Sequence, residues 1–318
     1  MKYRFMALLT AVFLSFSAST AVYAQSMDQS LLAQAEQTQE EQTQEEGQDQ
    51  NTEEGEIRQV VAFGADLSAE QKQIVMEAFG LDEASLSGID VITVTNAEEH
   101  EYLDSYLNSS VIGTKALSSV YVIKESEGHG LDISTSNINY CTISMYKNAL
   151  ITAGLEDATV VVAGPTQISG TAALIGCAKA YSEMTGEQIS EEGLDAAADE
   201  LVTTGEIGEA IGNADDAAEL IAYLKQYMIE NDLNDEASIS EEVQKRASEL
   251  GYELTDDEVA QITSLLMKIS KLDIDVNALK EQAKDIFNAL DLNNGSASGG
   301  FSGIVQSILS FFKGLFHS

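Results

Sequence analysis

The sequence predicts a mixed-sheet α/β domain followed by an acidic helical region. Residues 57–186 alternate short runs rich in Val, Ile and Tyr with helical patterns, which is typical of an α/β fold. A Gly-containing run between two of these strand patterns indicates a hairpin, so the sheet is expected to be mixed. Residues 187–290 show only helical periodicity.

The expected strands are rich in β-branched and aromatic residues. They cover Gln59–Ala65, Val91–Thr95, Ser118–Glu125, Gly130–Thr135 and Thr159–Ala163. The run Glu125–Gly130 joins the third strand to the fourth and predicts the turn of a β-hairpin.

Helices are expected between these strands, and two of them begin with the spacing of a capping box. Ser68 and Gln71 form one such pair, and Asn96 and Glu99 form another ahead of a helix over Ala97–Leu107. Further helical patterns cover Asn137–Ala153 and Thr171–Met184.

Residues 187–290 predict a helical region packed on or beside the sheet domain. Thr255–Glu258 reads as a capping box, and Val276–Leu290 carries a stripe of apolar residues. The segment has 26 acidic and 7 basic residues, so the outer faces of these helices are expected to be acidic.

The N-terminus predicts export. Residues 1–24 combine Lys2 and Arg4 with an apolar stretch and small residues near Ala24, which is the pattern of a cleaved signal peptide. Residues 25–56 hold ten acidic and no basic side chains, which indicates a disordered acidic tether. We therefore expect a secreted, extracellular protein that is associated with the cell surface or free.

The C-terminus predicts a flexible joint and an amphipathic helix. Residues 291–300 are rich in Asn, Gly and Ser, and Phe301–Phe316 gathers Ile, Leu and Phe largely on one face. Two interpretations stay open: this helix lies on a membrane surface, or it docks on the protein body or on another subunit.

Composition excludes several classes of function. The chain has 16 Lys+Arg against 53 Asp+Glu, a net charge of −37, which disfavours nucleic acid and anionic lipid as partners. It has no Gly-x-Ser-x-Gly, His-Glu-x-x-His or phosphate-loop pattern. Of its three histidines, His100 is expected to be a solvated residue at the start of a helix. No cofactor is predicted.

Metal and disulfide sites are weakly indicated. Asp273-x-Asp275-x-Asn277 opens like an EF-hand, but Ala278 and Lys284 stand where Gly and Glu are required, so no metal site is predicted. Low-affinity calcium binding by clustered carboxylates remains a weaker alternative. Cys141 and Cys177 each lie in an expected helix, and free thiols are favoured over a disulfide between them.

Ligands of α/β sheets tend to bind beyond the C-terminal ends of the strands. The residues there that suit a small ligand are Asp66, Thr166, Ser169 and Thr171. Helix capping and close packing explain the same residues, so they are places to look rather than an assigned site.

Several segments, in order along the chain, resemble the YpuA-like family of exported proteins from Gram-positive bacteria. They are Phe63–Ser68, Ile112–Val122, Ser169–Leu174, Leu254–Glu258 and Leu272–Asp275. The family is defined by a domain of unknown function, so the resemblance implies an extracellular or envelope setting and no activity.

The leading hypothesis is an exported, non-enzymatic protein that binds an envelope or protein partner. The alternative is a small-ligand-binding or hydrolytic enzyme domain that uses the loops at the strand ends.

Overall fold

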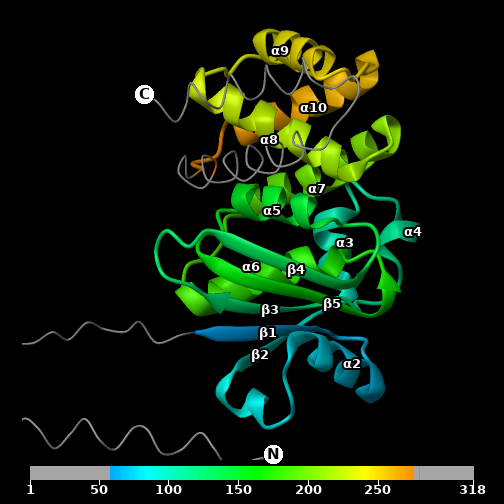
Figure 1. The fold of residues 1–318 in the computed structure, drawn as a ribbon, viewed down its shortest axis with the longest axis vertical. Coiled ribbons are helices and arrows are strands. Elements are labelled where there is room, and N and C mark those ends of the chain that lie inside the picture. The colour runs from blue at the N-terminus through cyan, green and yellow to red at the C-terminus, as the bar shows by residue number, and fades with distance from the viewer. Residues whose placement is uncertain (1–57, 275–278, 280–318) are drawn as a thin grey trace, which may run out of the picture. The chain divides into compact units, whose positions relative to one another are not determined.

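The computed structural model describes residues 58–274 and residue 279. The expected signal peptide, tether, joint and terminal helix, and most of the apolar stripe over Val276–Leu290, lie outside the described residues. Within these residues the mixed α/β class is confirmed: five strands alternate with helices, and α6 to α10 come after the last strand in the chain (Figure 1).

The sheet of the described part has five strands in the order β2-β1-β3-β5-β4. Every strand except β3 runs in the same direction, because β1 is parallel to β2, β4 is parallel to β5, and β3 is antiparallel to both its neighbours. The strands are β1 (Gln59–Gly64), β2 (Asp90–Val94), β3 (Ser119–Lys124), β4 (Leu131–Ile138) and β5 (Ala158–Ile168).

The expected hairpin of the third and fourth strands is wrong. β3 and β4 run in opposite directions, but β5 lies between them and pairs with both. The turn after β3 instead wraps around the start of β5, where Gly130 N–H donates to Asp157 Oδ1 at 2.8 Å and Thr159 Oγ1 donates to Glu125 Oε1 at 2.8 Å. The Val-rich β5 buries more apolar surface between two strands than as an edge strand, which explains its place inside the sheet.

The two faces of the sheet are covered by different helices, as the alternation of side chains along β1 shows. Val61 and Phe63 point to α2 (Ala69–Phe79), whereas Val60 and Ala62 point to a larger core on the opposite face. On that opposite face α6 (Thr171–Thr185) lies against β1, β2 and β3, and α5 (Ile143–Thr152) lies against β4, while α3 (Asn96–Leu103) packs on α6 (Figure 1).

The helix expected over Asn137–Ala153 begins six residues later than predicted. β4 continues through Ile138 because it pairs with the long β5, with a bulge at Asn137. Asn137 has a φ of 58° and its side-chain amide donates to the Gly164 carbonyl at 3.0 Å, so this residue type suits the bulge. Thr142 then caps α5.

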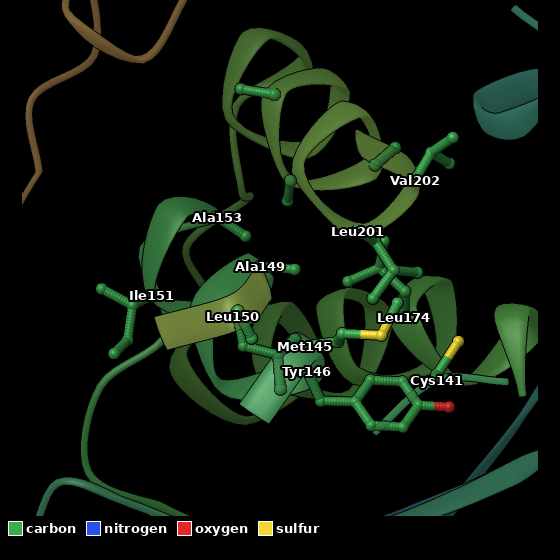
Figure 2. Packing of buried hydrophobic residues seen from close by; sticks show 14 of the residues in the cluster. Cys141, Met145, Tyr146, Ala149, Leu150, Ile151, Ala153, Leu174, Leu201 and Val202 are labelled. Carbon is green, nitrogen blue, oxygen red and sulfur yellow. The ribbon is translucent and has the colours of Figure 1, made fainter. Parts of the chain in front are cut away.

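The helical region stacks on the helices of the sheet domain and shares their core. Figure 2 shows Met145 and Tyr146 of α5, Leu174 of α6 and Leu201 of α7 within one apolar cluster. The region comprises α7 (Glu191–Ile211), α8 (Ala214–Glu230), α9 (Glu236–Glu249) and α10 (Asp256–Ile269). The expected capping box of Thr255 and Glu258 is confirmed at the start of α10.

A fully buried ion pair joins α5, α7 and α8. Lys225 Nζ lies 2.8 Å from Glu200 Oε1, and both side chains are 0% exposed. The ammonium also donates to Thr152 Oγ1 at 2.9 Å and to the Asn148 carbonyl at 3.1 Å, and Thr152 donates to the second oxygen of Glu200. All three ammonium hydrogens therefore have acceptors, which offsets part of the cost of burying the charge.

Candidate functional site

The C-terminal ends of β1, β2, β4 and β5 lie at the same end of the sheet, together with the N-terminal end of β3. We call this end of the strands the sheet edge. The segments that leave β1, β2, β4 and β5 lead to Asp66, to α3, to α5 and to the N-terminus of α6, respectively. A loop formed by residues 105–118, which includes the short helix α4 (Ser109–Ile112), returns to this edge before β3 begins. We call residues 105–118 the edge loop.

The edge loop lies directly against the end of β1. A Cβ on Gly64 would stand 2.4 Å from the Ala116 carbonyl oxygen, so only glycine allows this approach. Asp66 holds the same part of the loop, since its Oδ2 accepts from the Ala116 amide at 2.8 Å. Asp66 therefore has a positioning role in the described structure.

The four expected ligand residues are only partly brought together. Ser169 Oγ lies 3.3 Å from Thr171 Oγ1 at the start of α6, and Asp66 is close enough to act electrostatically on Glu99, which bonds to Thr171. Thr166 was expected beyond a strand end, but it lies on an exposed part of β5 because that strand continues to Ile168. It belongs to no part of this cluster.

The N-terminus of α6 is built around a glycine. Gly170 has a φ of 95°, and a Cβ there would stand 2.3 Å from the hydroxyl oxygen of Tyr146. That hydroxyl donates to the Gly170 carbonyl at 2.6 Å from a fully buried ring on α5. The turn that presents Ser169 and Thr171 is thus fixed by the core beneath it.

Glu99 is the residue of this edge that the sequence did not single out as functional. It is 1% exposed, and its carboxylate accepts from Thr171 Oγ1 at 3.0 Å and from Asn96 Nδ2 at 3.3 Å. Burial raises the pKa of Glu99 to about 7, although the two donors and the nearby His100 act in the opposite direction.

The capping box expected for Asn96 and Glu99 is displaced by one residue. Thr95 is the cap, and Glu98 at the third helical position returns its carboxylate to the Thr95 amide at 2.7 Å. Glu98 also pairs with Lys179 of α6 at 2.6 Å. Since Glu98 makes these surface contacts, its neighbour Glu99 points inward. The spacing Thr95-x-x-Glu98, which lies one residue before the expected box, is the signal in the sequence that indicates this cap.

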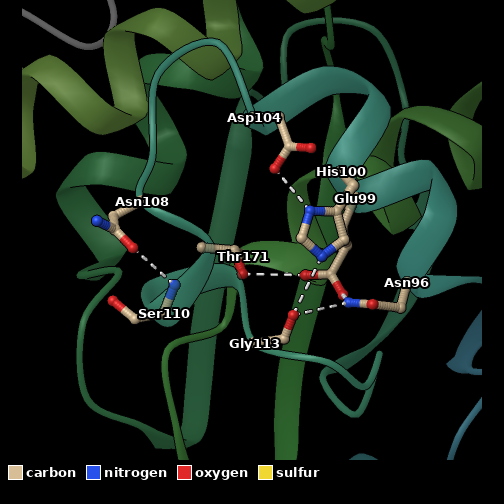
Figure 3. Close-up of polar contacts among 8 residues, drawn as sticks. All are labelled: Asn96, Glu99, His100, Asp104, Asn108, Ser110, Gly113 and Thr171. Carbon is tan, nitrogen blue, oxygen red and sulfur yellow. Dashed lines mark hydrogen bonds and ion pairs between the residues drawn. The ribbon is translucent and has the colours of Figure 1, made fainter.

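His100 is partly exposed, as expected of a surface histidine, but it is not merely solvated. Figure 3 shows its ring between Asp104 and the edge loop. Nδ1 lies 2.6 Å from Asp104 Oδ1 and Nε2 lies 3.1 Å from the Gly113 carbonyl oxygen. The hydrogen bond with Asp104 is the largest cause of a raised pKa for His100.

The two cysteines are buried free thiols. Cys177 lies in α6, but Cys141 lies in the turn before α5 instead of in a helix, because β4 extends to Ile138 and Thr142 starts the helix. Burial raises the pKa of Cys141 to about 12, so its thiol stays protonated and is a poor nucleophile.

Among residues 58–274 and 279, no cluster of three or more His, Cys, Asp or Glu side chains is arranged to hold a metal ion. The helices in this part of the chain include none that is long and apolar enough to cross a membrane.

A cavity of about 290 Å³ lies at the ends of α8 and α10, built from elements other than those of the sheet edge. It is lined by Met228, Ile229, Asp232, Leu233, Asn234, Ile269, Ser270, Leu272, Asp273 and Ile274.

Comparison with known proteins agrees with the resemblance read from the sequence. Residues 63–286 match the family described as "Protein of unknown function (DUF1002)". The chain is 39% identical over 264 residues to "Uncharacterized protein YpuA" of Bacillus subtilis (strain 168), which covers 81% of this chain and 87% of that protein. No solved structure matches. The match to most of the chain and the identity to YpuA show that the protein belongs to the DUF1002 family of unknown function.

Proposed function

We propose that this chain is an exported protein that works at the cell envelope by binding a partner and catalyses no reaction itself. One observation carries the proposal. The polar pair at the centre of the sheet edge, Glu99 and Thr171, has side chains that are each 1% exposed and bonded to one another. A substrate in solvent does not reach this pair, which supports a positioning role for it beneath a binding surface.

The sequence supports the envelope setting. Residues 1–24 have the pattern of a signal peptide, residues 25–56 that of a solvated acidic spacer, and Phe301–Phe316 an apolar face suited to surface attachment.

Deletion of Phe301–Ser318 is expected to move the protein from the cell fraction to the medium, because the deletion removes the apolar face that attaches it. Immunoblotting of fractionated cultures measures this distribution. As a matched control, Gln306→Ala with Ser310→Ala changes the polar side of the same segment and should leave the distribution unaltered. If the full and the shortened chain partition alike, surface attachment by this segment is wrong.

A second candidate is a small-ligand or hydrolytic site at the strand ends. The pairing of Ser169 with Thr171 at the start of α6, beside a carboxyl with a pKa of about 7, favours it.

Thermal unfolding of the full chain with candidate ligands separates the two functions. The panel holds Ca²⁺, peptidoglycan fragments, teichoic-acid fragments, nucleotides and simple sugars. Binding of an envelope partner predicts no change in Tm with nucleotides or simple sugars, whereas a ligand at about 100 times its Kd stabilises by about 2.7 kcal/mol and shifts Tm by a few degrees. A shift with a nucleotide or a simple sugar that is lost in Ser169→Ala but kept in Thr166→Ala, whose residue lies outside the cluster, would establish the second candidate and overturn the first.

A further inference from the structure

The edge loop is held at three places along its length. Near its start, the Tyr106 hydroxyl donates to Asp195 of α7 and accepts from Lys268 of α10 at 2.7 Å. Near its end, the Ala116 amide donates to Asp66. Between them, the Gly113 carbonyl accepts from His100 Nε2 at 3.1 Å, with Asn96 Nδ2 at the longer distance of 3.5 Å.

The middle attachment depends on the protonation of one ring. Both nitrogens of His100 face groups that only accept hydrogen bonds, the Asp104 carboxylate and the Gly113 carbonyl. A neutral imidazole carries one N–H and satisfies one of them, whereas the imidazolium satisfies both. When the ring loses a proton, the remaining one favours the charged carboxylate, and the bond to Gly113 is the one given up.

We infer that the edge loop is a proton-dependent strap over the ends of β1 and β2, closed by the imidazolium of His100 and released when that ring is neutral. The strap opens about its two outer attachments, at the Tyr106 hydroxyl and at the Ala116 amide, because neither of them involves His100. Its movement changes the surface presented at the sheet edge, whatever partner binds there, so the inference stands apart from the proposed function.

The charged surroundings of the ring reinforce this dependence. Asp104, the C-cap of α3, stabilises the imidazolium, and Glu99 of α3 adds to this once it ionises, at a pKa of about 7. Glu99 in turn is near Asp66 from the β1–α2 connection. The thiol of Cys141 and the phenol of Tyr146 also approach Glu99 from the α5 side, and burial keeps both neutral. The hydrogen bond with Asp104 raises the pKa of His100, so the imidazolium persists to higher pH than in an unpaired histidine.

Amide hydrogen exchange of the full chain, measured from about pH 6 to about pH 8.5, tests the strap across the histidine titration range. Exchange is expressed as protection factors, so that the intrinsic effect of pH is removed. The amide of Gly113, which donates to the Ser109 carbonyl in the middle of the loop, is the reporter. The amide of Ala116, which donates to Asp66 at an outer attachment, is the reference that should keep its protection, and NMR of the imidazole rings follows the titration of His100. Protection of the Gly113 amide is expected to fall by roughly two- to tenfold as His100 loses its proton, which is the range that the loss of one hydrogen bond implies.

Two histidine variants serve as test and control. Gln at position 100 still donates to Gly113 but does not titrate, so His100→Gln should make protection independent of pH. His129 lies exposed in the turn after β3, and His129→Gln should keep the native pH dependence. Constant protection in the native chain while His100 titrates, or an unchanged fall in His100→Gln, would overturn the inference.

A third variant keeps the test decisive if His100→Gln does not fold. Asp104→Asn removes the charge that raises the pKa of His100, so the loss of protection should move to lower pH. A midpoint that stays in place when the His100 titration moves would also overturn the inference.

Discussion

Replacing Lys225 with Met is expected to lower the free energy of unfolding by about 3–5 kcal/mol, which is the usual cost of removing one member of a buried ion pair. The cost arises from Glu200, which stays 0% exposed and loses the ammonium at 2.8 Å. Urea denaturation of the full chain at neutral pH measures the change. The double variant Lys225→Met with Glu200→Leu should recover most of the loss, because no uncompensated charge then remains.

Lys245 provides the matched control for this substitution. It pairs with Glu242 at 3.2 Å on α9, but its side chain is 48% exposed. Lys245→Met should therefore change the free energy of unfolding by less than about 0.5 kcal/mol. A similar small change in Lys225→Met would show that the charges of the core pair contribute nothing specific.

Glu99→Gln is expected to stabilise the protein increasingly as the pH rises from about 4.5 to about 7. In this window the folded state holds the Glu99 proton and the unfolded state releases it, so the native chain loses stability as the pH rises. The difference between a pKa of about 7 and the ordinary 4.5 corresponds to about 3 kcal/mol at pH 8. Gln cannot ionise and keeps an acceptor for Thr171, so it removes this loss.

Urea unfolding at a series of pH values measures the effect as the difference between variant and native chain. Comparing them in pairs is necessary because Glu219, whose pKa burial also raises to about 7, contributes its own pH dependence to both. Glu183→Gln changes an exposed carboxyl of α6 and should run parallel to the native curve. A constant difference between Glu99→Gln and the native chain across the pH range would contradict the burial of a neutral carboxyl.

Local patterns in the sequence predict the elements of this fold better than their pairing. The capping box at Ser68 starts α2 as expected, because its hydrogen bonds involve residues three apart. The position of β5 between β3 and β4 depends on contacts of distant segments, and the Glu125–Gly130 turn gives no sign of it. The same distant pairing extends β4 through Ile138, where the local pattern favours a helix.

The sheet edge was predictable, but the buried carboxyl within it was not. Strand order and direction bring Asp66 and the start of α6 to one edge, as expected from parallel strands. The inward position of Glu99 depends on whether the cap is Thr95 or Asn96, two neighbours with similar capping preferences. The pairing of Lys225 with Glu200 likewise depends on how α7 and α8 meet, which apolar periodicity alone does not specify.

The place of β5 between β3 and β4 also has a consequence for chain growth. A chain emerging from its N-terminus completes β3 and β4 more than twenty residues before β5 is finished at Ile168. Until then the facing edges of β3 and β4 have no partner, and β5 must enter between them and pair on both sides at once. Unpaired strand edges are open to other strands, so we expect the nascent chain to be a target for chaperone binding until β5 has emerged.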